Sequence, residues 1–147
     1  MEVQSLTLQV ADADLDALAA KLLPPDSPIE DLRIRLKPEG ACVSGMYPLL
    51  VNVSFECWWT VTVENGKAIA KIARLKAFGM PATVFKSAVL KSLETLAKDE
   101  FWIAVKGDEV QLDLEAFLSR HACPAKLNLR RISFQEGFAI VEAGATT

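Results

Sequence analysis

Uncharged residues occupy every second position from Val43 to Val63, and most of them are apolar. The positions between them are mostly polar, and this period of two is typical of a β-strand with one buried face. A straight strand over this stretch would span roughly 70 Å, whereas a compact domain of 147 residues has a diameter of roughly 40 Å. The strand must therefore bend, break at Pro48, or protrude. The simplest interpretation is a long strand that bends between Gly45 and Pro48 within a curved antiparallel sheet.

The segment from Pro81 to Lys98 predicts the principal helix, because its apolar residues recur at helical spacing. Pro81 suits a first helical turn, where the amide hydrogen that proline lacks would have no partner. Such a helix is roughly 25 Å long, and its length and apolar width match the concave face of a bent sheet. We therefore expect an α+β domain in which a long, strongly curved antiparallel sheet wraps around this helix, with two shorter helices elsewhere.

A tight hairpin is predicted at Asn65-Gly66, because a type I′ turn needs positive φ at both central residues. The return strand then runs from Lys67 to about residue 77. In the simplest register Glu64 faces Lys67 and Trp59 faces Ile72. Ala68 and Ala70 then lie opposite Val63 and Val61, so small side chains stand beside larger ones.

The length favours a single domain over residues 1–147. The order strand, helix, strand, turn, strand occurs twice, over residues 5–45 and 109–143, and we interpret this as an internal duplication. The second copy contains Arg130-Arg131, where the inward phase of the strand slips and a β-bulge is expected.

Composition narrows the classes of protein. The formal net charge of −3 argues against general nucleic-acid binding. Apolar residues make up 51% of the chain, against about 45–50% with glycine counted in typical domains. A well-packed core, a ligand cavity and an oligomer interface all account for this excess. Three widely spaced cysteines favour a reducing compartment. The first residues do not resemble a signal peptide, and no run of about 20 apolar residues predicts a transmembrane segment. We expect a cytoplasmic protein, or an exported one if the chain was trimmed.

The residues that could carry chemistry are sparse. His121 and Cys123 are close in sequence, but neighbours at a helix end seldom point at one another. Neither the cysteine spacing nor the acidic residues between Asp108 and Glu115 match a zinc or calcium motif. Arg33, Arg35 and Lys37 share one strand face, which is expected to be solvated. We therefore expect no enzyme, no metal and no cofactor.

Trp58 and Trp59 are adjacent in a strand, so their side chains point to opposite faces of the sheet. Trp59 shares its face with Phe55 and Val61, and we expect it to point inward. Trp58 then points outward. It is covered by another element, such as the helix that begins near Asp12, or it lies at an interface with a second copy of the chain.

Three segments together describe a long curved sheet around a long helix: VNVSFECWWTVTVENGKAIAKIARLKAFG, the helix MPATVFKSAVLKSLETLAKDE and the final hairpin NLRRISFQEGFAIVEAG. This arrangement resembles the tubular lipid-binding (TULIP, BPI-like) domains, including small bacterial members of that type. It is a match of pattern, since this superfamily has no diagnostic short motif. The resemblance implies an apolar groove between helix and sheet that holds acyl chains.

Two functions follow as hypotheses. The first is a non-enzymatic module that binds a lipid or fatty acid between helix and sheet. The second is a structural or protein-interaction domain that forms a homodimer through the Trp58 face and binds no ligand. For the first, the residues expected to line the groove are Phe55, Trp59, Val61, Phe85, Val89 and Leu93.

Overall fold

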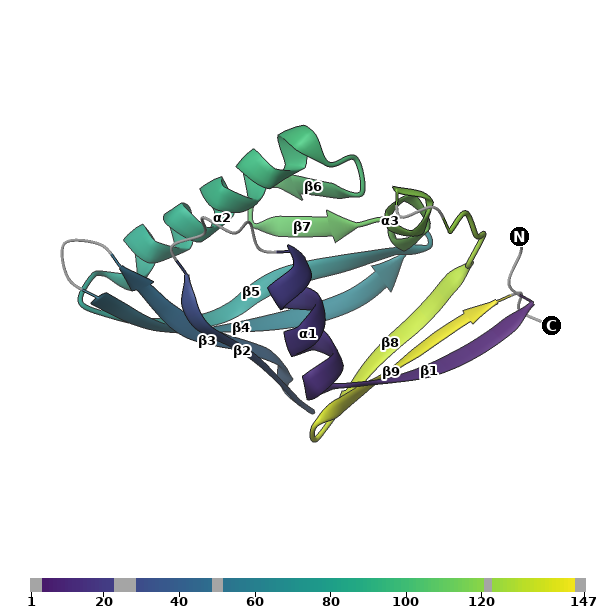
Figure 1. Ribbon diagram of the computed structural model, residues 1–147, viewed down its shortest axis with the longest axis horizontal. Helices are drawn as coiled ribbons and strands as arrows, with labels where there is room; N and C mark the ends of the chain where they lie inside the picture. The colour runs from purple at the N-terminus through teal and green to yellow at the C-terminus, as the bar shows by residue number, and fades with distance from the viewer. Residues whose placement is uncertain (1–3, 23–28, 49–51, 121–122, 145–147) are drawn as a thin grey trace.

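The computed structural model describes residues 4–22, 29–48, 52–120 and 123–144, and over these ranges the chain forms three helices and nine strands (Figure 1). The elements in chain order are β1 Ser5–Ala11, α1 Asp12–Leu22, β2 Glu30–Lys37, β3 Gly40–Pro48, β4 Asn52–Glu64, β5 Lys67–Phe78, α2 Ala82–Asp99, β6 Ile103–Lys106, β7 Glu109–Leu112, α3 Leu114–Arg120, β8 Leu129–Gln135 and β9 Phe138–Gly144.

The strands form two sheets in which every pair is antiparallel. The large sheet has six strands in the order β2-β3-β4-β5-β7-β6, and the small sheet has three in the order β1-β9-β8. The predicted α+β class with antiparallel sheets is therefore confirmed. Strand β8 of the small sheet lies against β2, β4 and β5 of the large sheet, so the two sheets enclose space between them.

The long alternation is two strands and not one bent strand. Strand β3 ends at Pro48, β4 begins at Asn52, and the two pair with each other so that Pro48 faces Asn52 and Gly45 faces Phe55. Residues 49–51 between them lie outside the described ranges. Because every facing pair in this register joins two odd or two even positions, the alternation keeps its phase through the reversal. The sequence pattern alone could not distinguish this reversal from a bend.

The sheet is not strongly curled, and α2 is not clearly wrapped by it (Figure 1). The expected strong curvature was inferred from the length of one continuous strand. Strand β3 instead ends at Pro48, which is one of the alternatives that the sequence left open. No strand therefore has to bend around the helix. Helix α2 instead lies against the β5 and β6 side of the large sheet. Phe85 is its fully buried residue, with 3% of its surface exposed.

The hairpin between β4 and β5 forms as predicted. Asn65 and Gly66 have φ values of 52° and 77°. Glu64 faces Lys67, Trp59 faces Ile72, and the alanines face the valines, so the predicted register is confirmed. The β-bulge expected near Arg130-Arg131 is also present as a shift in register between β8 and β9.

The two sheets are joined at the β2 edge. The carboxylates of Asp12 and Asp16 on α1 accept hydrogen bonds from the amides of Leu36 and Ile34, at 2.8 and 2.7 Å. On the same strand, the amide of Gly137 in the β8–β9 turn donates to the carbonyl of Leu36 at 2.7 Å. An exposed edge strand leaves such groups unpaired, so α1 and this turn both close the edge and hold the small sheet in place.

The strand-helix-strand-strand order does occur twice, as β1-α1-β2-β3 and β7-α3-β8-β9. The two segments do not form separate sheets, because β1 pairs with β9 and β7 pairs with β5. A duplication in one domain stays a prediction.

Candidate apolar ligand site

A cavity of about 610 Å³ lies between the large sheet, α2 and the small sheet. Every described strand and helix contributes to its lining, and none of the described residues on the lining is charged. The volume is within the roughly 300–1,000 Å³ typical of small-molecule sites. Because all the described elements border this space, it belongs to the fold as a whole and is not a local packing defect; we call it the main cavity.

Polar side-chain groups on the lining are few. The hydroxyl of Ser92 donates to the carbonyl of Ala88 at 3.0 Å, and the indole N–H of Trp102 donates to Glu100 at 3.0 Å. Tyr47 and Trp59 supply the other hydroxyl and indole. With so few partners, the described lining residues suit hydrocarbon and offer no counter-ion to a charged group.

All six residues predicted to line a groove do line this cavity: Phe55, Trp59, Val61, Phe85, Val89 and Leu93. They divide between two hydrophobic clusters. Phe55, Phe85 and Val89 belong to one cluster. The others pack in a second cluster around Ile103 and Val110. The structure thus brings the six predicted residues to one continuous space.

Small side chains help to make the space. Ala68 and Ala70 on β5 point to the cavity, opposite Val63 and Val61 of β4. Both alanines are buried, with 2% and 7% of their surfaces exposed. A buried alanine at an inward position leaves room that a larger residue would fill. This part of the cavity is therefore visible in the sequence once the register is known.

The contribution of the small sheet was missed. Val10, Ile132, Phe134, Ala139 and Val141 all line the cavity. Their strands showed the alternation of half-buried strands, but only pairing across the chain ends, β1 with β9, brings them to the site. No local sequence signal reports a contact between segments so far apart.

The cavity opens beside α2. Ala88, Ser92 and Leu96, which follow one another at every fourth position, line it and yet are exposed to solvent. We call these three residues the α2 stripe. Leu15 of α1 also lines the cavity, and Leu18, three residues further along α1, is 41% exposed. A stripe that carries apolar side chains and one small hydroxyl at a cavity opening gives an apolar ligand a path inward.

Water is a poor occupant of this cavity. At its liquid density the space corresponds to about 20 water molecules, each of which needs two to four polar partners. An apolar occupant would replace this poorly bonded water and bury the apolar lining, which stabilises the fold.

Cys57 lines the cavity, and only 2% of its surface is exposed. Burial, followed by the proximity of Cys42, raises the pKa of the Cys57 thiol to about 12. Because the thiolate is the nucleophilic form, a thiol with this pKa stays protonated near neutral pH. Cys57 thus acts as a small apolar group of the lining.

The other candidates from the sequence have structural roles or lie elsewhere. Asp108 and Glu109 pair with Lys86 and Lys71, at 3.7 and 2.9 Å. Glu115 accepts hydrogen bonds from the amides of Leu127 and Asn128. His121 lies outside the described residues, and Cys123 is exposed. Among the described residues, no group of three or more His, Cys, Asp or Glu side chains could hold a metal ion.

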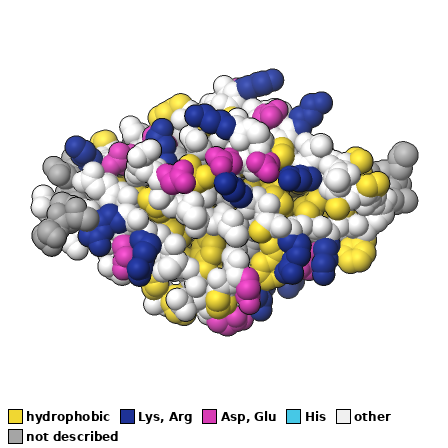
Figure 2. Space-filling model, turned by 180° about the vertical axis from the view of Figure 1, so that it is seen from behind, with side chains coloured by type: hydrophobic (Ala, Val, Ile, Leu, Met, Phe, Trp, Pro, Cys, Tyr) yellow, Lys and Arg dark blue, Asp and Glu magenta, His cyan; other side chains and the backbone are white. Residues whose placement is uncertain are grey.

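Two of the basic residues on β2 are paired: Arg35 with Asp16 at 3.2 Å, and Lys37 with Glu136 at 3.1 Å. Seen from behind, the surface mixes cationic and anionic side chains with scattered hydrophobic ones (Figure 2). Such an arrangement creates no field of a single sign over that side.

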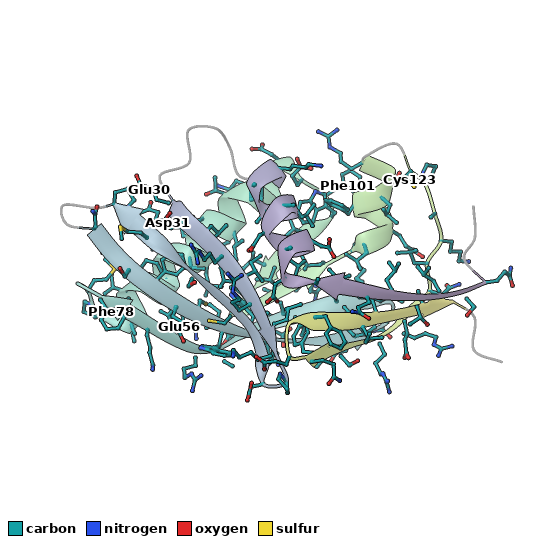
Figure 3. All side chains as sticks on the ribbon, turned by 60° about the horizontal axis from the view of Figure 1, so that its bottom comes forward. Glu30, Asp31, Glu56, Phe78, Phe101 and Cys123 are labelled. Atoms are coloured by element: carbon teal, nitrogen blue, oxygen red, sulfur yellow. The ribbon has the colours of Figure 1, made fainter. Side chains whose placement is uncertain are left out.

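Trp58 lies on the face of β4 opposite to Trp59, and α1 does not cover it. Helix α1 packs against β1 and β2, and its Leu15 lines the cavity behind the sheet. The indole N–H of Trp58 donates to Glu56 at 2.7 Å, and the Arg74 guanidinium lies 4.9 Å from the ring centroid. Glu56 projects from this outer face in Figure 3. A homodimer through Trp58 stays a prediction.

Comparison of the chain with protein-family models, curated proteins and solved structures finds no match. Among the described helices, none has the length and apolar character needed to cross a membrane. The resemblance to tubular lipid-binding domains therefore stays a prediction.

Proposed function

We propose that this protein is a non-enzymatic binding module for an apolar, lipid-like ligand. The observation that carries the proposal is the uncharged cavity of about 610 Å³. Burial of hydrocarbon in such a space is favourable by about 0.8 kcal/mol per methylene. A ligand with a single acyl chain fits this chemistry best.

The position of the opening supports a fatty acid as the simplest ligand. The described lining residues offer a carboxylate no counter-ion, so its desolvation in the cavity would be costly. At the α2 stripe the head group can remain in water while the chain enters the cavity. The ligand head group is thus expected near Ser92, and the chain beside Phe85, Val89 and Trp59.

The proposal agrees in function with the resemblance to TULIP domains, and it does not depend on a curled sheet. What supports it is an apolar cavity between a long helix and antiparallel strands. No reaction is assigned, because the described side chains on the lining include no base, acid or activated nucleophile.

Native mass spectrometry of the purified protein tests the proposal directly, together with displacement of a fluorescent fatty acid. We expect co-purifying lipid and saturable displacement by unlabelled palmitic acid. A homogeneous protein that carries no lipid and binds no fluorescent fatty acid would refute the proposal.

A pair of variants on α2 localises the binding. Val89→Glu places a carboxylate in the cavity and should weaken binding by at least about tenfold, because the charge must be desolvated. Ser87→Glu makes a similar change on the exposed side of the same helix and should leave affinity within about twofold, as surface changes usually do. Circular dichroism of both variants checks that each is folded.

A further inference from the structure

A second apolar cavity, of about 220 Å³, lies between α3 and the small sheet. Among the described residues, Leu114 and Val141 line both this cavity and the main one. The two spaces are therefore neighbours separated at these side chains.

The small sheet provides one continuous floor for both cavities. Across its three strands, Val141 pairs with Leu8 on one side and Ile132 on the other. The next inward row on one side, at Ala139, borders the main cavity, and the next row on the other side, at Ala143, borders the second. Val141 thus stands in the middle row, at the boundary between the two.

Leu114 is held over this boundary by the residue before it. The amide of Asp113 donates to the carbonyl of Trp102 at 2.8 Å, and its carboxylate accepts from the amide of Ala116 at 3.0 Å. The second contact is an N-cap of the kind that fixes where a helix begins. Leu114, the first residue of α3, is therefore placed by the backbone.

An aromatic pair completes the boundary. Trp102 lines the main cavity, Phe117 lines the second, and their rings meet edge to face with centroids 5.1 Å apart. The indole of Trp102 is fixed by its hydrogen bond to Glu100. The side chain of Leu114, by contrast, is not branched at Cβ and has several rotamers, so it can move away from the boundary by changing rotamer.

We propose that Leu114 and Val141 form a partition that sets the longest acyl chain the main cavity accepts, with the second cavity as a reserve beyond it. This inference rests on the proposed function, because it concerns the ligand of the same site. A chain that ends before the partition is fully buried. A longer chain stays partly outside, or must displace Leu114 to reach Leu118 and Leu129.

The experiment is a chain-length series of saturated fatty acids, from lauric to lignoceric acid, measured by displacement of a fluorescent fatty acid. For the natural sequence, affinity should rise by about fourfold per added methylene and then level off. Leu114→Ala and Val141→Ala should move the levelling point to longer chains. Leu114→Phe should leave it unchanged or move it to shorter ones.

Leu90→Ala is the matched control, because Leu90 of α2 packs against the cluster around Ile103 and Val110 but lines neither cavity. It should lower thermal stability without moving the levelling point. If Leu114→Ala does not fold, Val141→Ala and Leu114→Phe still give opposite expectations.

The outcomes separate the two proposals. Binding with the same levelling point in every variant, or with none in the natural sequence, overturns the partition and leaves the proposed function standing. No binding of any chain length by the natural sequence overturns both.

Discussion

Phe85 of α2 packs against Phe55 of β4 with ring centroids 5.0 Å apart and planes inclined by 33°. This contact fixes the helix to the large sheet beside the main cavity, and Tyr47 meets the Phe85 ring edge to face, at 6.4 Å. The position of the cavity roof thus depends on one buried side chain of α2.

Phe85→Ala is therefore expected to destabilise the protein by about 3–5 kcal/mol, since it removes a buried ring and leaves a void. Urea unfolding followed by circular dichroism measures the change. Phe78→Ala is the control, because Phe78 is 67% exposed and projects from one end of the molecule (Figure 3); it should cost no more than about 0.5 kcal/mol. Equal losses in the two variants would contradict the assigned role of Phe85.

The joint between the sheets makes a second prediction. Asp12→Ala leaves the amide of Leu36, which is 2% exposed, without its hydrogen-bond partner. The free energy of unfolding should fall by about 1–3 kcal/mol. Hydrogen exchange should show faster exchange in β2 and in the β8–β9 turn. Glu39→Ala, at an exposed turn beside the same strand, serves as control, and unaltered exchange at Leu36 in Asp12→Ala would argue against the joint.

Much of the fold could be predicted from local patterns, whereas the pairing of the two ends of the chain in the small sheet could not. The Asn65-Gly66 turn fixed the register of β4 and β5, and through it the inward position of Trp59, Ala68 and Ala70. The sequence did not decide between a reversal and a bend after Pro48, because two antiparallel strands in this register keep the same alternation as one bent strand. The small sheet joins the two ends of the chain, and such pairing depends on the global arrangement of strands and not on local propensity.

The thiol of Cys57 gives a prediction about pH. Its pKa rises from the usual value of 9.0 to about 12 in the folded protein, so the folded state keeps a proton that the unfolded state releases. The stabilisation is complete below pH 9 and is lost as the pH rises from there toward 12. Cys57→Ala should remove this component, so that the variant loses less stability than the natural sequence between about pH 8 and about pH 10.5. Urea midpoints at both pH values measure the difference. An equal loss of stability in Cys57→Ala and in the natural sequence would refute the prediction.

The exposed thiol supplies a companion test. Iodoacetamide near neutral pH should label Cys123, which is exposed, and leave Cys42 and Cys57, which are buried. Peptide mass spectrometry identifies the labelled sites. Full labelling in urea confirms that all three thiols are free, whereas rapid native labelling of Cys57 would mean that the cavity admits water and reagent readily.

The Trp58 face allows a direct decision on self-association. If a homodimer forms there, Trp58→Glu should convert it to a monomer in size-exclusion chromatography with light scattering. The control is Ser87→Glu, because Ser87 is exposed on α2, which packs on the opposite face of the sheet; it should leave the association unchanged. A natural sequence that stays monomeric at high concentration would remove the homodimer and leave Trp58 as the partner of Glu56 and Arg74.

Ligand removal should reveal how much of the stability comes from the occupant of the cavity. Extraction of bound lipid is expected to lower the melting temperature, because the uncharged cavity cannot be refilled by well-bonded water. Adding palmitic acid at about 100 times its dissociation constant should restore about 2.7 kcal/mol. In Val89→Glu the same addition should restore far less, while Ser87→Glu should respond like the natural sequence. A melting temperature that is indifferent to extraction and to added fatty acid would mean that the protein's own side chains collapse into the space, and that the cavity holds no ligand.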